Sequence, residues 1–253
     1  MRKRRDDRIG EVKFNKHGSE MIIIEYKNCL NIVVQFNDGY ITGVTYQEFC
    51  QGMVRNPHDK TIHNVGCIGI GSHLATLNSE TTKKYRVWER MLQRCYDLKF
   101  QEKHPTYIGC TVCNEWHNYQ KFGDWFDENY YEVDKDKVDL DKDILIKNNK
   151  IYNPDTCVFV PENINSLFTK TNAKRGKYPI GATFHSKTGK YQSQCNINKK
   201  LKYLGLYNTP EEAFYVYKKF KEKEIKKLAN EYKEKIPQKL YDALCRYEVE
   251  ITD

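Results

Sequence analysis

The sequence contains no long apolar run. No stretch of eighteen consecutive apolar residues occurs among its 253 residues, although a membrane-spanning helix needs about that length. The first ten residues, MRKRRDDRIG, are rich in arginine, but no apolar segment of the kind found in signal peptides follows them. We therefore expect a cytoplasmic protein that neither spans a membrane nor is secreted.

The chain also lacks an excess of acidic residues. It has 42 Lys and Arg residues against 34 Asp and Glu residues, and its formal net charge is +8 at pH 7. A basic balance of this size favours an anionic partner such as nucleic acid. A solvated basic surface without such a partner is the alternative interpretation.

The sequence divides into three modules and a tail, for which we expect an α+β fold. Because a domain has roughly 100–200 residues, the chain is long enough for more than one. The expected boundaries are 1–75, 76–172, 173–235 and 236–253. In the small N-terminal β module, the β-branched runs Met21–Tyr26 and Asn31–Phe36 predict a hairpin, with a third strand after the turn at Asn37–Gly39.

The middle module is expected to contain two amphipathic helices and a cysteine cluster. One helix begins near Ser79–Thr82 and the other covers Tyr119–Tyr130. In a reducing compartment, the nine cysteines of the chain are expected to be thiols or metal ligands. A structural Zn²⁺ site of four cysteines is one interpretation, and buried free thiols are the other. The candidate ligands are Cys95, Cys110, Cys113 and Cys157.

A histidine is missing from the segment 140–161, LDKDILIKNNKIYNPDTCVFVP. With RVWERMLQRCYD (86–97), YIGCTVCNEW (107–116) and NINSLF (163–168), this segment resembles a group of phage-encoded HNH-like proteins over most of residues 85–170. The resemblance implies a ββα hairpin module with flanking helices, in which a histidine of the first strand is the general base. Lys142 stands at that place, and a protonated ammonium cannot accept a proton from water.

The same resemblance carries candidate catalytic roles to Asp141 and Asp143 in the first strand and to Asn163 or Asn165 at the helix. Strand alternation predicts Asp139, Asp141 and Asp143 on one face and Lys142 on the other. Oxygen ligands of this kind suit Mg²⁺ or Mn²⁺ if the module cleaves DNA. A solvated acidic surface is the alternative, and Lys142 is then expected to contact a phosphate.

The third module is predicted to consist of three strands followed by a helix. The strands are expected at Ile180–Phe184, Lys190–Ile197 and Leu201–Tyr207, and the Thr209 cap predicts a helix that runs to about Tyr232. This order, in GATFHSKTGKYQSQCNINKKLKYLGLYNTPEEAFYVYKKF (181–220), resembles the plant ethylene-response-factor, or Apetala-like, DNA-binding domain. The resemblance implies an antiparallel sheet that lies in the DNA major groove. The residues expected at the DNA are Lys187, Lys190, Gln192, Gln194, Lys199, Lys200, Lys202 and Tyr203.

Two functional hypotheses follow. The first is a phage or mobile-element protein that binds double-stranded DNA and holds a degenerate HNH-like module, with metal-dependent nicking left open. The second is a non-enzymatic phage protein that binds and inhibits a host protein such as a defence complex, because the strands lack the arginine and tryptophan of the DNA-binding family. Both place the protein in the cytoplasm of a bacterial host, and neither indicates an oligomeric state.

Overall fold

A computed structural model describes residues 6–134, 136–168, 178–197 and 200–253. Helices and strands are mixed throughout these residues, which confirms the α+β class. Contacts divide the chain into two compact units, residues 1–128 and residues 129–253, so the division falls inside the expected middle module. No helix in the described ranges is long and apolar enough to cross a membrane.

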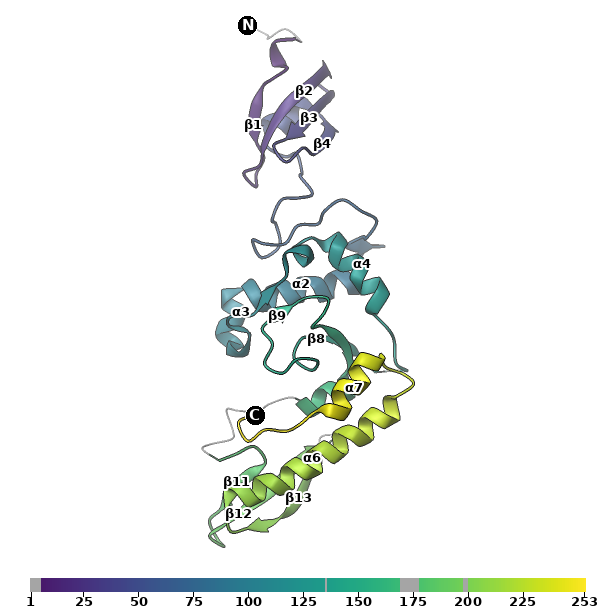
Figure 1. The fold of residues 1–253 in the computed structure, drawn as a ribbon. Coiled ribbons are helices and arrows are strands. Elements are labelled where there is room, and N and C mark those ends of the chain that lie inside the picture. Colours follow the sequence, from purple (N-terminus) through teal and green to yellow (C-terminus); the bar gives the residue numbers. More distant parts are fainter. Residues whose placement is uncertain (1–5, 135, 169–177, 198–199) are drawn as a thin grey trace. The chain divides into compact units, whose positions relative to one another are not determined.

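The first unit begins with a four-stranded antiparallel sheet in the order β1-β2-β3-β4 (Figure 1). Its central hairpin pairs Met21 with Phe36, as the two β-branched runs predict. A capping box between Thr45 and Glu48 starts the short helix α1, and the buried Phe49 closes one face of the sheet. The elements are η1 (Asp6–Arg8), β1 (Val12–Phe14), β2 (Glu20–Asn28), β3 (Asn31–Phe36), β4 (Ile41–Val44) and α1 (Tyr46–Cys50).

The rest of the first unit is built on an aromatic core. The indole N–H of Trp88 donates to the carbonyl oxygen of Trp116 at 2.7 Å, so this buried polar group is satisfied. A Cβ at Gly66 would lie only 2.9 Å from the Trp88 ring. Because glycine has no side chain, the 66–75 loop can lie close to α2. The elements are β5 (Thr76–Leu77), β6 (Glu80–Thr81), α2 (Lys83–Tyr96), α3 (Leu98–Lys103), η2 (Pro105–Tyr107), β7 (Thr111–Val112), η3 (Asn114–His117) and α4 (Tyr119–Asn129).

The second unit begins with the predicted hairpin. β8 (Val138–Asp141) pairs antiparallel with β10 (Val158–Pro161), and Leu140 lies opposite Phe159. The short strand β9 (Ile151–Tyr152) lies between them in sequence, and α5 (Glu162–Asn165) and η4 (Ser166–Phe168) follow. A ββα order is therefore present.

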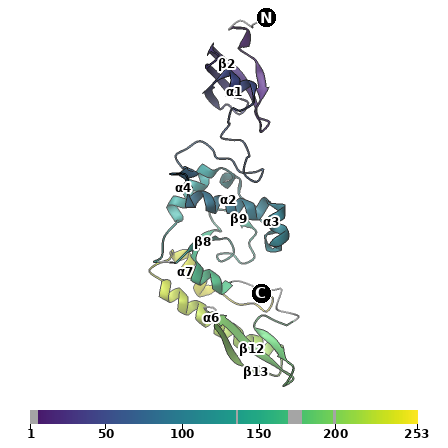
Figure 2. The same cartoon turned by 180° about the vertical axis from the view of Figure 1, so that it is seen from behind.

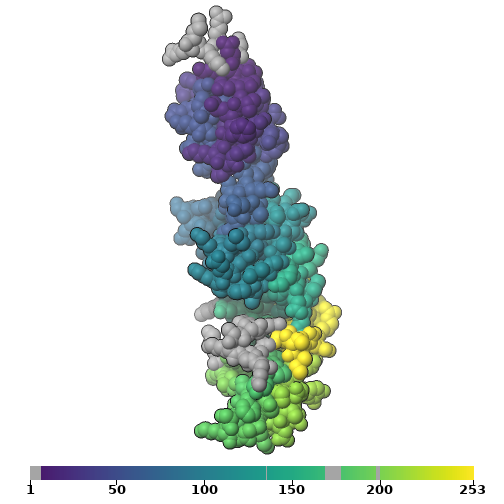
Figure 3. All heavy atoms as spheres, turned by 90° about the vertical axis from the view of Figure 1, so that its left-hand side faces the viewer, coloured from purple at the N-terminus to yellow at the C-terminus, as the bar shows by residue number. Residues whose placement is uncertain are grey.

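A three-stranded antiparallel sheet and two helices complete the second unit. The sheet contains β11 (Ala182–His185), β12 (Lys190–Ile197) and β13 (Lys200–Tyr207), and it is followed by α6 (Pro210–Tyr232) and α7 (Gln238–Arg246). Figure 3 shows atoms of the C-terminal segment, in yellow, directly against those of α6. The tail therefore contains a helix, α7, that contacts α6.

The helix α6 packs against two parts of the second unit. Phe214 and Tyr217, in its first half, are buried against the sheet with Cys195. Ile225 and Ala229, in its second half, share a core with the hairpin and α7. The other buried members of this core are Ile144, Val158, Val160, Ile164, Leu167, Ile236, Leu240 and Leu244. The hairpin and the sheet, placed in different modules by the sequence, therefore share one helix.

Candidate nucleic-acid interface

The β11–β13 sheet has one face covered by α6 and one face directed away from it (Figures 1 and 2). The hydroxyl of Ser193 donates to the carbonyl oxygen of Ala213 at 2.8 Å, which fixes Ser193 on the helix side. Cys195, two residues along β12, is buried against the same helix. Because side chains alternate along a strand, the residues between and beside these two lie on the outer face.

The outer face of β12 carries a row of amide side chains. Gln192, Gln194 and Asn196 occupy successive outer positions, and the Gln192 Nε2 donates to the Gln194 Oε1 at 3.2 Å. Strand register pairs each amide with an apolar or aromatic residue of β13: Gln192 with Leu206, Gln194 with Tyr203 and Asn196 with Leu201. Leu201 is 66% exposed and Tyr203 is 57% exposed.

A bulge in β13 sets this pairing. Ser193 lies opposite Gly205 whereas Gln194 lies opposite Tyr203, so Leu204 has no partner of its own in the ladder. Gly205 has a φ of 129°, and a Cβ there would meet the Tyr207 hydroxyl at 2.8 Å. The extra residue lets Leu206 and Tyr203 point to the same face although they are three positions apart.

Basic residues lie at one end of the outer face. Lys190 pairs in register with His185, whose Nδ1 lies 3.0 Å from the Thr188 hydroxyl. Lys187 is exposed in the turn between β11 and β12. These cations are placed to contact an anion that lies against the sheet.

Two of the predicted DNA contacts lie on the opposite side of the sheet. The Lys202 ammonium lies over the Phe220 ring of α6 at 4.8 Å. Lys200 pairs with Ile197, which packs against the core under α6, so alternation places Lys200 on that side as well. Lys199 falls outside the described residues. The outer face and its turn therefore contain Lys187, Lys190, Gln192, Gln194 and Tyr203 from the predicted set.

The charge of this region was a signal that our sequence analysis missed. Between Glu162 and Glu211 the chain has nine basic residues and no Asp or Glu. Lysines in such a stretch have few carboxylates nearby in sequence to pair with. The residues are Lys170, Lys174, Arg175, Lys177, Lys187, Lys190, Lys199, Lys200 and Lys202.

Lys142 is buried inside the hairpin loop. Its Nζ donates to both carboxylate oxygens of Asp143, at 2.6 and 2.7 Å, and to the Asn149 carbonyl oxygen at 2.8 Å. Lys142 is 6% exposed, and its ammonium also lies 5.9 Å from the centre of the Tyr152 ring. A phosphate contact would require this arrangement to break.

The expected alternation of the three aspartates does not extend through the hairpin, because β8 ends at Asp141. The Asp141 Oδ1 accepts from the backbone N–H groups of Asp143 and Ile144, at 2.7 and 2.8 Å, and so forms the turn that follows the strand. Burial raises the pKa of Asp141 above its usual value, although these two hydrogen bonds oppose the shift.

The candidate catalytic residues do not form a metal site. One Asp141 oxygen is occupied by two backbone donors, and both Asp143 oxygens are occupied by Lys142. The Asn163 Nδ2 donates to the Asp136 carboxylate and to the Tyr232 hydroxyl, whereas Asn165 is half-buried at the end of α5. These residues therefore do not fit Mg²⁺ or Mn²⁺ as they stand.

None of the four predicted zinc ligands forms a disulfide bond. Burial raises the pKa of the Cys113 thiol, which disfavours the thiolate that binds zinc. Among the residues that the structure describes, no three His, Cys, Asp or Glu side chains form a group that could hold a metal ion. Zinc binding by these cysteines stays a prediction, which elemental analysis would test.

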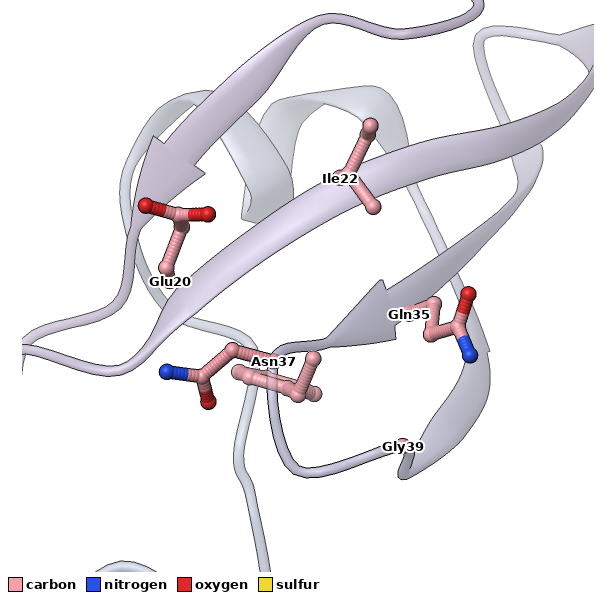
Figure 4. A pocket seen from close by; sticks show the side chains of 6 residues that line it. Glu20, Ile22, Gln35, Asn37 and Gly39 are labelled. Atoms are coloured by element: carbon pink, nitrogen blue, oxygen red, sulfur yellow. The ribbon is translucent and has the colours of Figure 1, made fainter.

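A shallow hollow of about 300 Å³ lies on the N-terminal sheet. Figure 4 shows Glu20 and Ile22 on one strand and Gln35 on its neighbour, with Asn37 and Gly39 beyond the strand end. Phe36 completes the lining. Glu20 is the one ionisable group of this lining, so the hollow offers no acid and base pair.

A less obvious polar cluster joins the 66–75 loop to the helices of the first unit. The His73 Nε2 lies 2.9 Å from Asp124, and the Lys84 Nζ lies 2.8 Å from the His73 Nδ1 and 2.6 Å from Asp127. No sequence motif predicts this cluster, because its members are up to 54 positions apart. Since the His73 ring also meets the Tyr119 ring edge to face, the cluster fixes the loop on α4.

No protein-family model, no curated protein and no solved structure matches this chain.

Proposed function

We propose that this chain binds double-stranded DNA through the outer face of the β11–β13 sheet. The observation that carries the proposal is the row of amides from Gln192, Gln194 and Asn196 on a surface directed away from α6. Side-chain amides combine a donor and an acceptor, and they can form two hydrogen bonds with one base edge. A two-stranded ribbon also fits the width of the DNA major groove.

The charge around the sheet supports the same partner. Lys187 and Lys190 lie at one end of the outer face, and the stretch from Glu162 to Glu211 has no acidic residue between its ends. The phosphates that flank a groove are the anions that such lysines would contact. Binding is therefore expected to combine phosphate contacts at the rim with base contacts at the centre.

The hairpin has a structural part in this proposal. Its Lys142 is held by Asp143 and Asn149, and its strands share a core with α6. We assign it no cleavage step, since the side chains that would bind a metal ion are engaged with each other and with the backbone. It supports the helix on which the sheet is mounted.

The test is the salt dependence of duplex binding by the full chain, measured by fluorescence anisotropy. The logarithm of the affinity is expected to fall linearly with the logarithm of the salt concentration. The double substitution Lys187→Ala/Lys190→Ala should reduce the slope by about two, because each lost phosphate contact removes about one.

A matched control removes the same charge elsewhere. Lys223→Ala/Lys226→Ala changes two exposed lysines of α6 and should leave the slope unchanged. Affinity that does not respond to salt, or an equal loss in the two double variants, would contradict DNA binding by this face.

A second candidate function is binding and inhibition of a host protein such as a defence complex. The exposure of Leu201 and Tyr203 favours it, because aromatic and apolar side chains at a surface are typical of protein interfaces. A nuclease-treated pull-down would support this function if one stoichiometric host protein is recovered and Tyr203→Ala abolishes its recovery. Duplex binding by the same purified chain, lost with that variant, would instead support the first proposal.

A further inference from the structure

The outer face pairs two kinds of side chain across one strand boundary. Each amide of β12 lies directly opposite an apolar or aromatic residue of β13, in the pairs Gln192–Leu206, Gln194–Tyr203 and Asn196–Leu201. Side chains opposite each other on one face of a sheet are close neighbours, with Cβ atoms about 4.5–5.5 Å apart. A single base pair can therefore meet both members of such a pair.

An A·T base pair presents matching groups in its major groove. Adenine offers the N7 acceptor and the N6 donor, which a Gln or Asn amide binds with two hydrogen bonds, and thymine offers a methyl group for apolar contact. Guanine offers two acceptors, which Arg or Lys side chains bind, and none of the three pairs contains either residue. No arginine occurs between residues 178 and 207, which include all three strands.

The spacing along β12 also suits the duplex. Alternate residues of a strand are about 6.6–6.8 Å apart. Successive bases of one DNA strand rise by about 3.4 Å, so two steps cover about the same distance. Gln192, Gln194 and Asn196 are thus spaced to reach every second base.

We propose that the outer face of β12 and β13 reads A·T base pairs in the major groove, with the amide row on adenine and the apolar row on thymine methyl groups. This inference rests on the DNA binding proposed above and adds the bases that it recognises. Lys187 and Lys190, at the end of the same face, supply the complementary charge for the flanking phosphates.

Modified duplexes of equal length test the assignment without altering the protein. One duplex is A·T-rich, a second has G·C in its place, and a third has inosine·cytosine, which resembles A·T in the minor groove and G·C in the major groove. We expect the A·T duplex to bind at least about fivefold more tightly than both others. This estimate comes from the free energy by which one bidentate amide–adenine contact discriminates against a wrong base. Replacing thymine by uracil, or adenine by 7-deazaadenine, should also weaken binding.

Each outcome decides between specific statements. If inosine·cytosine binds as well as A·T, recognition is in the minor groove and the inference is overturned. If all three duplexes bind with the same affinity, DNA binding is supported but recognition of A·T base pairs is excluded. If no duplex binds, the proposed function itself fails.

Two variants locate the recognition on the named rows. Gln194→Ala should lower the ratio of A·T to G·C affinity while leaving G·C affinity nearly unchanged, and Leu201→Ala should reduce the difference between thymine and uracil duplexes. Gln47→Ala, an exposed amide of α1, is the matched control and should change neither ratio. Circular dichroism verifies that each variant is folded. Unchanged ratios in folded Gln194→Ala and Leu201→Ala proteins would overturn the assignment of the rows.

Discussion

The ammonium of Lys142 holds the hairpin loop closed by local contacts. Its three acceptor oxygens come from Asp143 and Asn149, and the Asn149 Nδ2 donates back to the Lys142 carbonyl oxygen at 2.9 Å. The two residues therefore brace the loop from both sides. Lys142 therefore has a structural role in this loop.

Replacing Lys142 by methionine is expected to destabilise the protein by about 1–3 kcal/mol, which is the cost of losing hydrogen bonds made by a charged group. The Asn149 carbonyl loses its donor, whereas Asp143 is half-exposed and can be rehydrated. Urea denaturation measures the change. The control Lys226→Met removes an exposed lysine of α6 and should leave the free energy of unfolding within about 0.5 kcal/mol. An equal effect in both variants would exclude a bracing role.

Asp141 predicts a pH dependence of stability. Since folding raises its pKa, the protonated carboxyl is favoured in the folded state, and this contribution is present at pH below the unfolded pKa and lost as pH rises through the folded pKa. Asp141→Asn keeps an oxygen acceptor for Asp143 and Ile144 without the charge. We expect the variant to be at least as stable as the wild type at pH 7, with an advantage that shrinks toward pH 4.

Chemical denaturation of both proteins across this pH range measures the difference. Asp141→Ala, which removes the acceptor, should be less stable at every pH, by about 1 kcal/mol for a lost cap. An Asn variant that is less stable than wild type at pH 7 would show that the carboxylate charge is needed.

At the scale of elements, the bulge in β13 determines which side chains face the partner. Gly205→Ala is expected to destabilise the sheet, because a φ of 129° is unfavourable for alanine and the new Cβ would meet the Tyr207 hydroxyl. We expect a loss of at least about 1 kcal/mol and weaker duplex binding, measured by thermal unfolding and anisotropy. Gly189→Ala is the control variant. Gly189 lies in an open turn with a φ of 66°, so alanine there introduces backbone strain without a steric clash. Equal binding by the Gly205 variant would show that the bulge does not set the face.

The strands and helices of the second unit were largely predictable, because their signals are local. Thr209 caps α6 by accepting from the Glu212 N–H at 3.2 Å, as its sequence motif indicates. The faces of β13 were not predictable, because the bulge depends on pairing with β12. The prediction of both Lys202 and Tyr203 at the DNA overlooked that neighbouring residues of a strand point to opposite faces, and Lys202 lies over Phe220. The burial of Lys142 likewise depends on Asn149, seven residues away, and on the end of β8 at Asp141.

At the scale of the whole molecule, the second unit should unfold as a single body. Leu240 of α7 is fully buried in the core that contains Ile225 of α6, and α6 also covers the sheet. Leu240→Ala should cost about 2–5 kcal/mol. Hydrogen exchange should rise both in β10, whose Val158 and Val160 belong to this core, and in β12, whose buried Cys195 belongs to the core under the sheet. The exposed-site control Leu98→Ala should leave both strands unchanged, and protection of β12 that survives Leu240→Ala would indicate two separate domains.

Because the sheet and the hairpin both pack on α6, this helix fixes the distance between them. Phe214 packs under the sheet and Ile225 packs under the hairpin, and eleven residues of helix separate them by about 16 Å along the axis. That length corresponds to about five base steps of a duplex. If the sheet binds DNA, the hairpin would lie at a fixed distance from the bound bases. The DNA region protected by the protein would then end a constant number of base pairs from those bases, whatever the flanking sequence.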